Sequence, residues 1–311
     1  MLHIVSSTSR LTLRALFLAS AVALGVGSAA SAVHAEPATA QAPASFVSDR
    51  LSVQVVGQGP DVILIPGMAS SREVWQAEAE RLKATHRVHL VQLAGFAGEP
   101  WVHGDGAFLQ PMIDELARYV AQHTDGRPAV IGHSMGALTG LMLAQQHPDR
   151  VDRLMSVDSL PFFGALMGPT ATVETVRPAA ERMSAIVLGS SEQDFLAGQR
   201  MTANGMARDE TDRERIVQWS LATDRHALAA AMSDVMTTDM RPLLAGISTP
   251  VTALYASDAN GGAPAAMADA MWSSQYADLP GVRLIRIDGS RHFIMMDQPA
   301  AFAEAVDDFL K

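Results

Sequence analysis

The chain has 311 residues, a formal net charge of −10, 48% hydrophobic residues and no cysteine. This length can bury a sizeable core in one large domain or two ordinary ones. The absence of cysteine excludes disulfides, thiolate nucleophiles and cysteine-based metal sites. The acidic balance argues against a nucleic-acid partner, because a polyanion needs a basic surface to bind.

The N-terminus has the pattern of a secretory signal peptide. Two arginines precede an uncharged, apolar run over residues 16–27, and small residues follow it. A basic segment, an apolar run of this length and an A-x-A-like end are typical of a segment removed on export, whereas a retained membrane anchor needs ~20 apolar residues. We therefore expect residues 1–35 to be cleaved after Ala32 or Ala35. The mature protein is then periplasmic or secreted, with no stable membrane insertion.

The first half of the remaining chain alternates between strand-like and helix-like segments. Residues 36–49 are rich in Ala and Pro and predict a flexible leader. After it we expect strands at 51–56, 61–65, 87–93, 128–132 and 151–157, and helices at 71–84, 108–123 and 135–147. This alternation predicts an α/β fold whose mostly parallel sheet is covered by helices on both faces.

The second half contains a block without strand signals. Helix-like segments are expected at 172–188, 192–203, 209–222 and 225–237. Alternation then resumes with a strand at 250–257, a helix at 263–276, a strand at 282–287 and a closing helix at 299–310. We therefore predict an α/β core formed by 50–159 and 246–311, with a helical cap inserted at 160–245.

The strongest local motif is Gly132-His133-Ser134-Met135-Gly136, which follows an apolar strand and opens a helix. A G-x-S-x-G sequence in this setting indicates a tight strand-to-helix turn that lifts the serine hydroxyl above the sheet. The helix N-terminus favours the negative charge that develops there. Ser134 is therefore the predicted nucleophile, and His133 is expected to pack or hydrogen bond locally.

A serine nucleophile needs a base, and the base needs an acid. His292 follows the last predicted strand and lies in a loop at the carboxyl edge of the sheet, where Ser134 also lies and where active sites of open α/β sheets form. Asp258 follows the strand at 250–257 and reaches the same edge. Asp158 does so after the strand at 151–157. We prefer Asp258 as the acid and keep Asp158 as the alternative.

These motifs resemble the α/β-hydrolase-fold serine hydrolases, and the resemblance covers nearly the whole mature chain. The order Ser134, Asp258, His292 matches the order of the triad in that fold. The stretch 289–293 followed by 298–300 resembles the histidine loop and final helix of the family, and 239–244 before 249–251 resembles its exit from the cap. The resemblance implies acyl transfer by a carboxylesterase-like enzyme with a helical cap, without cofactor or metal.

The resemblance also implies an oxyanion hole built from two backbone N–H groups. One belongs to Met135, the residue after the nucleophile. The other comes from Met68, in the loop after the strand at 61–65. Pro66 stands where the family usually has histidine. Because the donor is a backbone group, this difference affects the support of the loop more than the donor itself.

An exported protein of this kind most simply acts on small esters or lactones with an apolar acyl or alcohol part. The cap is rich in methionine, whose flexible thioethers suit adaptable apolar pockets. The aromatic candidates for the substrate pocket are Phe96, Trp101, Phe162, Phe163 and Phe293. Two alternatives remain open: an amidase or perhydrolase using the same triad, or a non-catalytic ligand-binding protein that kept the fold.

Overall fold

The computed structural model describes residues 46–311. The expected signal peptide, its cleavage site and most of the expected leader lie outside the described residues.

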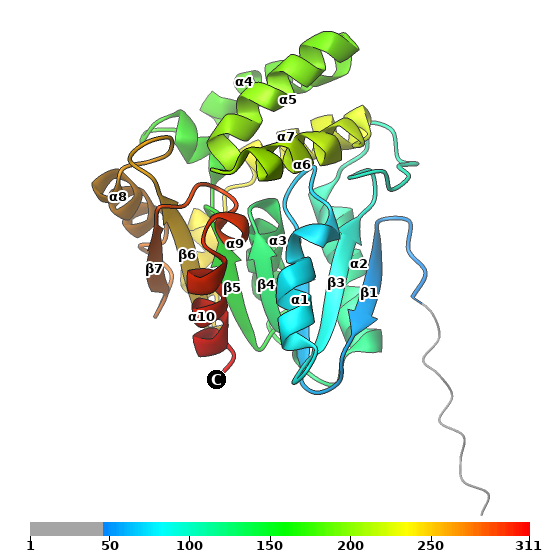
Figure 1. Ribbon diagram of the computed structural model, residues 1–311, viewed down its shortest axis with the longest axis vertical. Coiled ribbons are helices and arrows are strands. Elements are labelled where there is room, and N and C mark those ends of the chain that lie inside the picture. Colours follow the sequence, from blue (N-terminus) through cyan, green and yellow to red (C-terminus); the bar gives the residue numbers. More distant parts are fainter. Residues whose placement is uncertain (1–45) are drawn as a thin grey trace, which may run out of the picture. The chain divides into compact units, whose positions relative to one another are not determined.

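The centre of the fold is a seven-stranded sheet with the order β1-β3-β2-β4-β5-β6-β7 (Figure 1). Its strands are β1 (Leu51–Val56), β2 (Asp61–Ile65), β3 (Arg87–Leu93), β4 (Ala129–His133), β5 (Arg153–Val157), β6 (Val251–Ser257) and β7 (Arg283–Asp288). Only β1 pairs antiparallel with its neighbour, and the other pairings are parallel. The predicted mostly parallel α/β fold is therefore confirmed.

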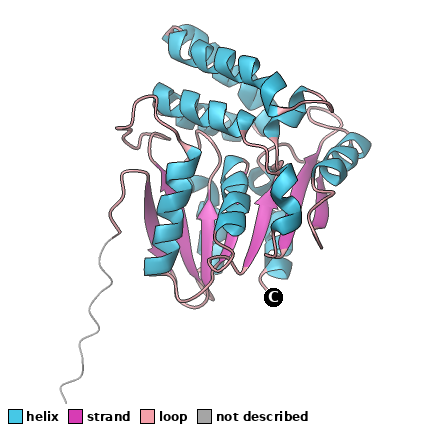
Figure 2. Ribbon diagram, turned by 180° about the vertical axis from the view of Figure 1, so that it is seen from behind, coloured by secondary structure: helices cyan, strands magenta, loops and turns pink. Residues whose placement is uncertain are grey.

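Helices cover both faces of this sheet (Figure 2). They are α1 (Gln76–Leu82), α2 (Leu109–His123), α3 (Met135–Gln146), α8 (Ala265–Gln275), α9 (Ile294–Asp297) and α10 (Pro299–Phe309), and a 3₁₀ turn, η1 (Arg72–Trp75), precedes α1. Alternate residues of β2 enter different hydrophobic clusters: Ile63 packs with α2 and α3, whereas Leu64 packs with α1 and α10. Burial on both faces explains why β2 and β4 are mostly apolar along their length instead of alternating with polar residues.

Four helices, α4 (Val173–Gly189), α5 (Glu192–Met206), α6 (Glu210–Leu221) and α7 (Arg225–Thr237), form the block between β5 and β6. Two 3₁₀ turns, η2 (Phe163–Met167) and η3 (Arg241–Gly246), flank it. Each helix begins at a Thr, Ser or Asp whose side chain accepts a hydrogen bond from a backbone N–H of the first turn; Asp224 does so for α7. Figure 1 shows these helices above the carboxyl ends of the parallel strands.

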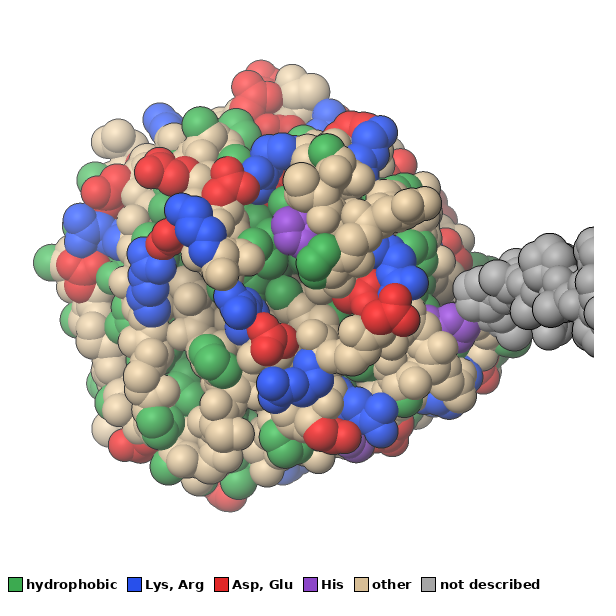
Figure 3. All heavy atoms as spheres, turned by 90° about the horizontal axis from the view of Figure 1, so that it is seen from below, with side chains coloured by type: hydrophobic (Ala, Val, Ile, Leu, Met, Phe, Trp, Pro, Cys, Tyr) green, Lys and Arg blue, Asp and Glu red, His purple; other side chains and the backbone are tan. Residues whose placement is uncertain are grey.

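On the face opposite these helices, acidic and basic side chains are interspersed (Figure 3). Of the helices that the structure describes, none has the length and apolar character that crossing a bilayer requires.

Candidate active site

Ser134 sits at a sharp turn between β4 and α3, as the motif predicts. Its backbone has φ 53° and ψ −122°, a region that residues with a side chain seldom adopt. The Ser134 N–H donates to Val157 O at 2.9 Å, which ties the turn to the neighbouring strand β5. The strained backbone is thus held by the sheet, and it projects the hydroxyl at the carboxyl edge.

The glycines on either side of the nucleophile are required by close backbone approach. A Cβ atom at Gly132 would lie 2.4 Å from the carbonyl oxygen of Gly136. A Cβ atom at Gly136 would lie 2.4 Å from the carbonyl oxygen of Ile65, at the end of β2. Because both obstacles are backbone atoms that cannot move aside, the turn excludes any larger residue at these positions.

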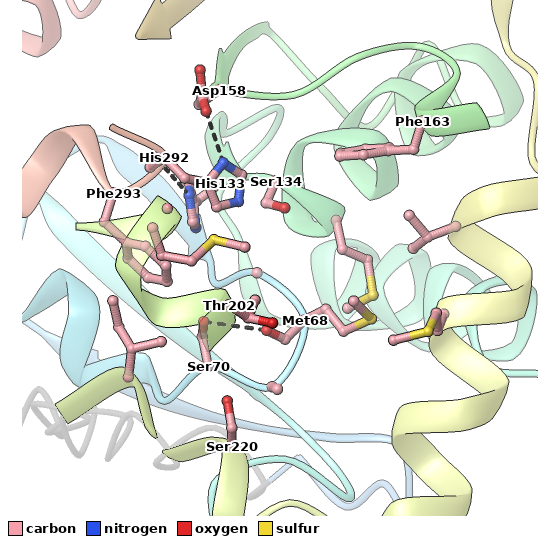
Figure 4. A pocket seen from close by; sticks show the side chains of 18 of the residues that line it. Met68, Ser70, His133, Ser134, Asp158, Phe163, Thr202, Ser220, His292 and Phe293 are labelled. Atoms are coloured by element: carbon pink, nitrogen blue, oxygen red, sulfur yellow. Dashed lines mark hydrogen bonds and ion pairs between the residues drawn. The ribbon is translucent and has the colours of Figure 1, made fainter. Parts of the chain in front are cut away.

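His292 lies in the loop between β7 and α9, and its Nδ1 is 2.7 Å from Asp158 Oδ2. The other carboxylate oxygen, Oδ1, accepts the Ala256 N–H at 2.9 Å. A carboxylate fixed in this way holds the proton of His292 on Nδ1 and leaves Nε2 free to act as a base. Figure 4 shows the His292 ring between Asp158 and the Ser134 side chain.

The expected pairing of His292 with Asp258 is corrected by this geometry. Asp258 Oδ2 instead binds Arg291 Nε at 3.1 Å, and Oδ1 accepts the Asn260 N–H at 3.0 Å. The Asn260 N–H and the Arg291 guanidinium hold the pKa of Asp258 below its usual value. Asp158 and Asp258 follow the adjacent strands β5 and β6, so both reach the same edge. Their side-chain directions then decide the partner of His292.

Arg291 links this carboxylate to the helical block. Its Nη1 donates to Asn204 O at 2.5 Å and to Ala207 O at 3.1 Å, both at the end of α5. Next along the chain, the Phe293 N–H donates to Met206 O at 2.9 Å. The loop that carries His292 is therefore fastened to α5 on both sides of the histidine.

His133, next to the nucleophile, contacts the same loop. Its Nε2 lies 3.0 Å from the His292 carbonyl oxygen, and its ring centroid lies 4.5 Å from that of His292 and 4.6 Å from that of Phe293. Burial, followed by the repulsion of the nearby His292 ring, lowers the pKa of His133 well below its usual value. A neutral His133 can donate Nε2–H to that carbonyl, in line with its expected local role.

The two predicted oxyanion donors, Met68 and Met135, line the same pocket as Ser134. Met135 is the first residue of α3, a position whose N–H has no partner within the helix. A Cβ atom at Gly67 would lie 3.2 Å from Ser134 Cβ, so the loop bearing Met68 passes close to the nucleophile. The positions of both residues beside Ser134 are thus compatible with the expected oxyanion role.

The pocket over Ser134 has a volume of about 530 Å³ and is enclosed by core loops and by the helical block. Ser134, His292 and Asp158 all line it. Besides Met68 and Met135, its larger apolar lining residues are Leu160, Phe163, Leu166, Met183, Met206, Ile216, Leu228, Met232, Val235, Met236, Trp272 and Phe293. Two of the five aromatic candidates, Phe163 and Phe293, are thus at the pocket.

The other three aromatic candidates belong to the hydrophobic core and do not line the pocket. Phe96 stacks on Phe108 with ring centroids 4.8 Å apart, and Trp101 stacks on the same ring at 5.3 Å. Phe162 is fully buried, with the Arg241 guanidinium 4.5 Å above its ring. The expectation for these three is corrected, because an aromatic residue that packs the core and one that lines a pocket look alike in a sequence.

Within residues 46–311, no three His, Asp or Glu side chains are grouped so that they could hold a metal ion. Among the polar residues that line the pocket, Ser134, His292 and Asp158 are those arranged for proton transfer from a nucleophile to a base. Their arrangement suits nucleophilic attack on a carbonyl, assisted by a base and an oxyanion site.

Several known proteins are similar to this chain. A pimeloyl-[acyl-carrier protein] methyl ester esterase from Vibrio atlanticus is 28% identical over 212 residues, which cover 67% of this chain and 80% of the relative. The same enzyme from Aeromonas hydrophila is 28% identical over 263 residues, 84% of this chain and 99% of the relative.

Solved structures show the same fold at lower sequence identity. The enol-lactonase from Burkholderia xenovorans is 18% identical with a TM-score of 0.69, over 84% of this chain and 96% of that chain. A thermophilic esterase from Thermogutta terrifontis is 24% identical with a TM-score of 0.66, over 84% of this chain and 92% of that chain.

Esterases among the relatives support ester hydrolysis as the general activity. Residues 62–305, most of the chain, match the model of the alpha/beta hydrolase family. Together with the seven-stranded sheet and the turn at Ser134, this match establishes that the chain belongs to the alpha/beta hydrolase family.

Proposed function

We propose that this protein is an exported serine hydrolase that cleaves carboxylic esters or lactones of small, largely apolar substrates. The observation that carries the proposal is the line from Asp158 through His292 to Ser134 at the floor of one pocket. Three residues in this arrangement can pass a proton from the serine to the histidine, while the carboxylate stabilises the imidazolium that forms.

The reaction begins when Ser134 Oγ attacks the substrate carbonyl carbon and His292 Nε2 takes the hydroxyl proton. The carbonyl oxygen becomes an oxyanion, which accepts hydrogen bonds from the Met68 and Met135 N–H groups. The tetrahedral intermediate then expels the alcohol, which receives the proton from His292. Water, deprotonated by His292, attacks the acyl-enzyme and releases the acid in the same way.

The pocket favours neutral, apolar substrates. Its lining is mostly aliphatic, aromatic and methionine side chains, and it includes no Lys or Arg among the described residues. A volume of about 530 Å³ is that of an ordinary small-molecule site. The relatives named as methyl ester esterases favour an ester over an amide as the scissile bond.

The proposal is tested with 4-nitrophenyl esters of increasing chain length, followed by lactones, amides and a peracid assay. We expect ester hydrolysis and labelling by a fluorophosphonate probe, and loss of both in Ser134→Ala. A matched control is Ser190→Ala, because that hydroxyl donates to Ile186 O at 2.5 Å and does not line the pocket. Binding of esters without turnover or labelling would instead indicate the non-catalytic alternative.

A further inference from the structure

One part of the otherwise apolar pocket is polar. Ser70, Thr202 and Ser220 all line it, and they come from the loop after β2, from α5 and from α6 respectively. Figure 4 shows these three residues on the same side of the view, away from Phe163. Three separate elements thus place hydroxyl groups in one region of the pocket, beyond the triad and the oxyanion site.

Two of these hydroxyls lack the bond that some other Ser and Thr hydroxyls in the helices of this protein form with the helix backbone. Thr139 donates to Met135 O at 2.9 Å, and Thr237 donates to Ser233 O at 2.7 Å, the usual bond to the carbonyl four residues earlier. In residues 46–311, Thr202 and Ser220 form no such bond, and their side chains face the pocket.

Ser220 is the most informative of the three, because the residue is only 6% exposed. A hydroxyl in a largely buried residue that lacks a protein partner takes its hydrogen bond from whatever occupies the pocket, which is water or a ligand. Ser70 is buried as well, and its hydroxyl makes a long bond of 3.4 Å to Met68 O. That bond leaves the Ser70 oxygen free to accept a second one.

The charge of the pocket limits what these hydroxyls can bind. The described lining contains no Lys or Arg, and its one carboxylate, Asp158, is bound to His292. A substrate carboxylate or ammonium group placed here would lose its hydration without gaining a counter-ion, which is strongly unfavourable. A neutral oxygen loses much less and regains its hydrogen bonds from hydroxyl groups.

We propose that the pocket selects esters that carry a second, uncharged oxygen, such as a hydroxyl, ether or carbonyl group, bound by Ser220, Thr202 and Ser70. This inference rests on the proposed esterase function and narrows its substrate class. The second oxygen distinguishes a preferred substrate from a plain alkyl ester of the same length. The absence of a counter-ion distinguishes it from an ester that ends in a carboxylate.

The test compares kcat/KM for three kinds of 4-nitrophenyl ester of equal chain length. One acyl chain is unsubstituted, one set carries a hydroxyl at successive carbons, and one chain ends in a carboxylate. We expect the best-placed hydroxy ester to exceed the plain ester by about tenfold, because one hydrogen bond to an otherwise unsatisfied group is worth about that factor. The carboxylate ester is expected to be the poorest of the three.

Ser220→Ala and Thr202→Val should each reduce the ratio of kcat/KM between the hydroxy and plain esters severalfold. Thr202 lies on the exposed side of α5, so its replacement by the similarly shaped Val should leave folding intact, which thermal unfolding checks. Thr237→Val is a matched control, because its hydroxyl is already bonded within α7 and does not line the pocket. This control should keep the wild-type ratio.

The results separate this inference from the esterase function on which it depends. A wild-type enzyme that hydrolyses plain and hydroxy esters equally, or prefers the carboxylate ester, overturns the polar subsite and leaves the esterase function standing. The same holds if neither substitution changes the ratio. A purified protein that hydrolyses none of these esters contradicts the proposed function itself.

Discussion

At the scale of single residues, the structure shows which carboxylate contacts His292. Asp158 rather than Asp258 contacts His292. We therefore expect Asp158→Asn to lower kcat for a 4-nitrophenyl ester on the order of 10³- to 10⁴-fold, because an amide there stabilises neither the correct tautomer nor the imidazolium. Steady-state kinetics on the purified variant measures this loss.

The companion variant Asp258→Asn serves as the control for that experiment. It removes the charge that faces Arg291 but leaves the bond between Asp158 and His292 in place. We expect it to retain far more activity than Asp158→Asn. The assignment is wrong if Asp258→Asn is the more severely impaired of the two while both remain folded by circular dichroism.

His133 gives the protein a dependence of stability on pH. Its pKa is lowered in the folded state, so the unfolded chain binds a proton first as the pH falls below about 6.5. The free energy of unfolding should therefore decrease below that pH, by up to about 1.4 kcal/mol per pH unit for this one group. Urea unfolding between pH 5 and 8 measures the slope.

The contribution of His133 is isolated by His133→Gln, whose amide can still donate to the His292 carbonyl. Burial also lowers the pKa of His89, but that group is present in both proteins and cancels in the difference. We expect a shallower loss of stability in the variant on the acid side. Parallel curves for the two proteins would show that His133 does not resist protonation in the folded state.

At the scale of secondary-structure elements, the local pattern predicted most of what the structure contains. The motif at Ser134 specified a strand, a strained turn and a helix, because only glycine can occupy positions 132 and 136 beside the backbone there. The acid was harder to predict. The strands β5 and β6 are adjacent and parallel, so Asp158 and Asp258, which follow them, lie at the same edge of the sheet. The local sequence pattern does not show which of the two carboxylates turns toward the histidine.

The contact between α5 and the histidine loop gives Asp258 a structural role in place of the expected catalytic one. Its bond to Arg291 orients a guanidinium that also holds two carbonyls at the end of α5. Removing either partner leaves the other charge poorly compensated in a largely buried site. The two residues should therefore act as a unit in stabilising this contact.

A double-mutant cycle tests that unit. We expect Asp258→Asn and Arg291→Gln to lower the free energy of unfolding by amounts that do not add, with a coupling energy of about 1 to 3 kcal/mol between them. Chemical unfolding of the wild type, both single variants and the double variant supplies the four values. Additive effects would mean that the contact seen between the two side chains contributes nothing specific.

At the scale of the whole molecule, the alternation of strands and helices predicted a covered parallel sheet with a helical block inserted between two of its strands. The pocket between them was less accessible to prediction. Phe96, Trp101 and Phe162 fill the core, whereas Phe163 and Phe293 face the cavity. Which side of a packed element an aromatic residue faces depends on the assembled tertiary structure, and spacing along the chain does not determine it.

Export of the whole molecule is the remaining expectation from the sequence. The apolar run at 16–27 is the part that membrane insertion machinery must bind, so a charge within it should prevent translocation. For the chain expressed in a Gram-negative host, we expect the wild type in the periplasm or medium. Its intact mass should be that of a chain beginning after Ala32 or Ala35.

Two variants test this expectation. Leu18→Arg should stay in the cytoplasm at full length, whereas Gln41→Arg, beyond the cleavage sites, should be processed normally. A wild-type protein recovered uncleaved from the cytoplasm would rule out export, although the esterase activity, which depends on residues after 46, would be unaffected.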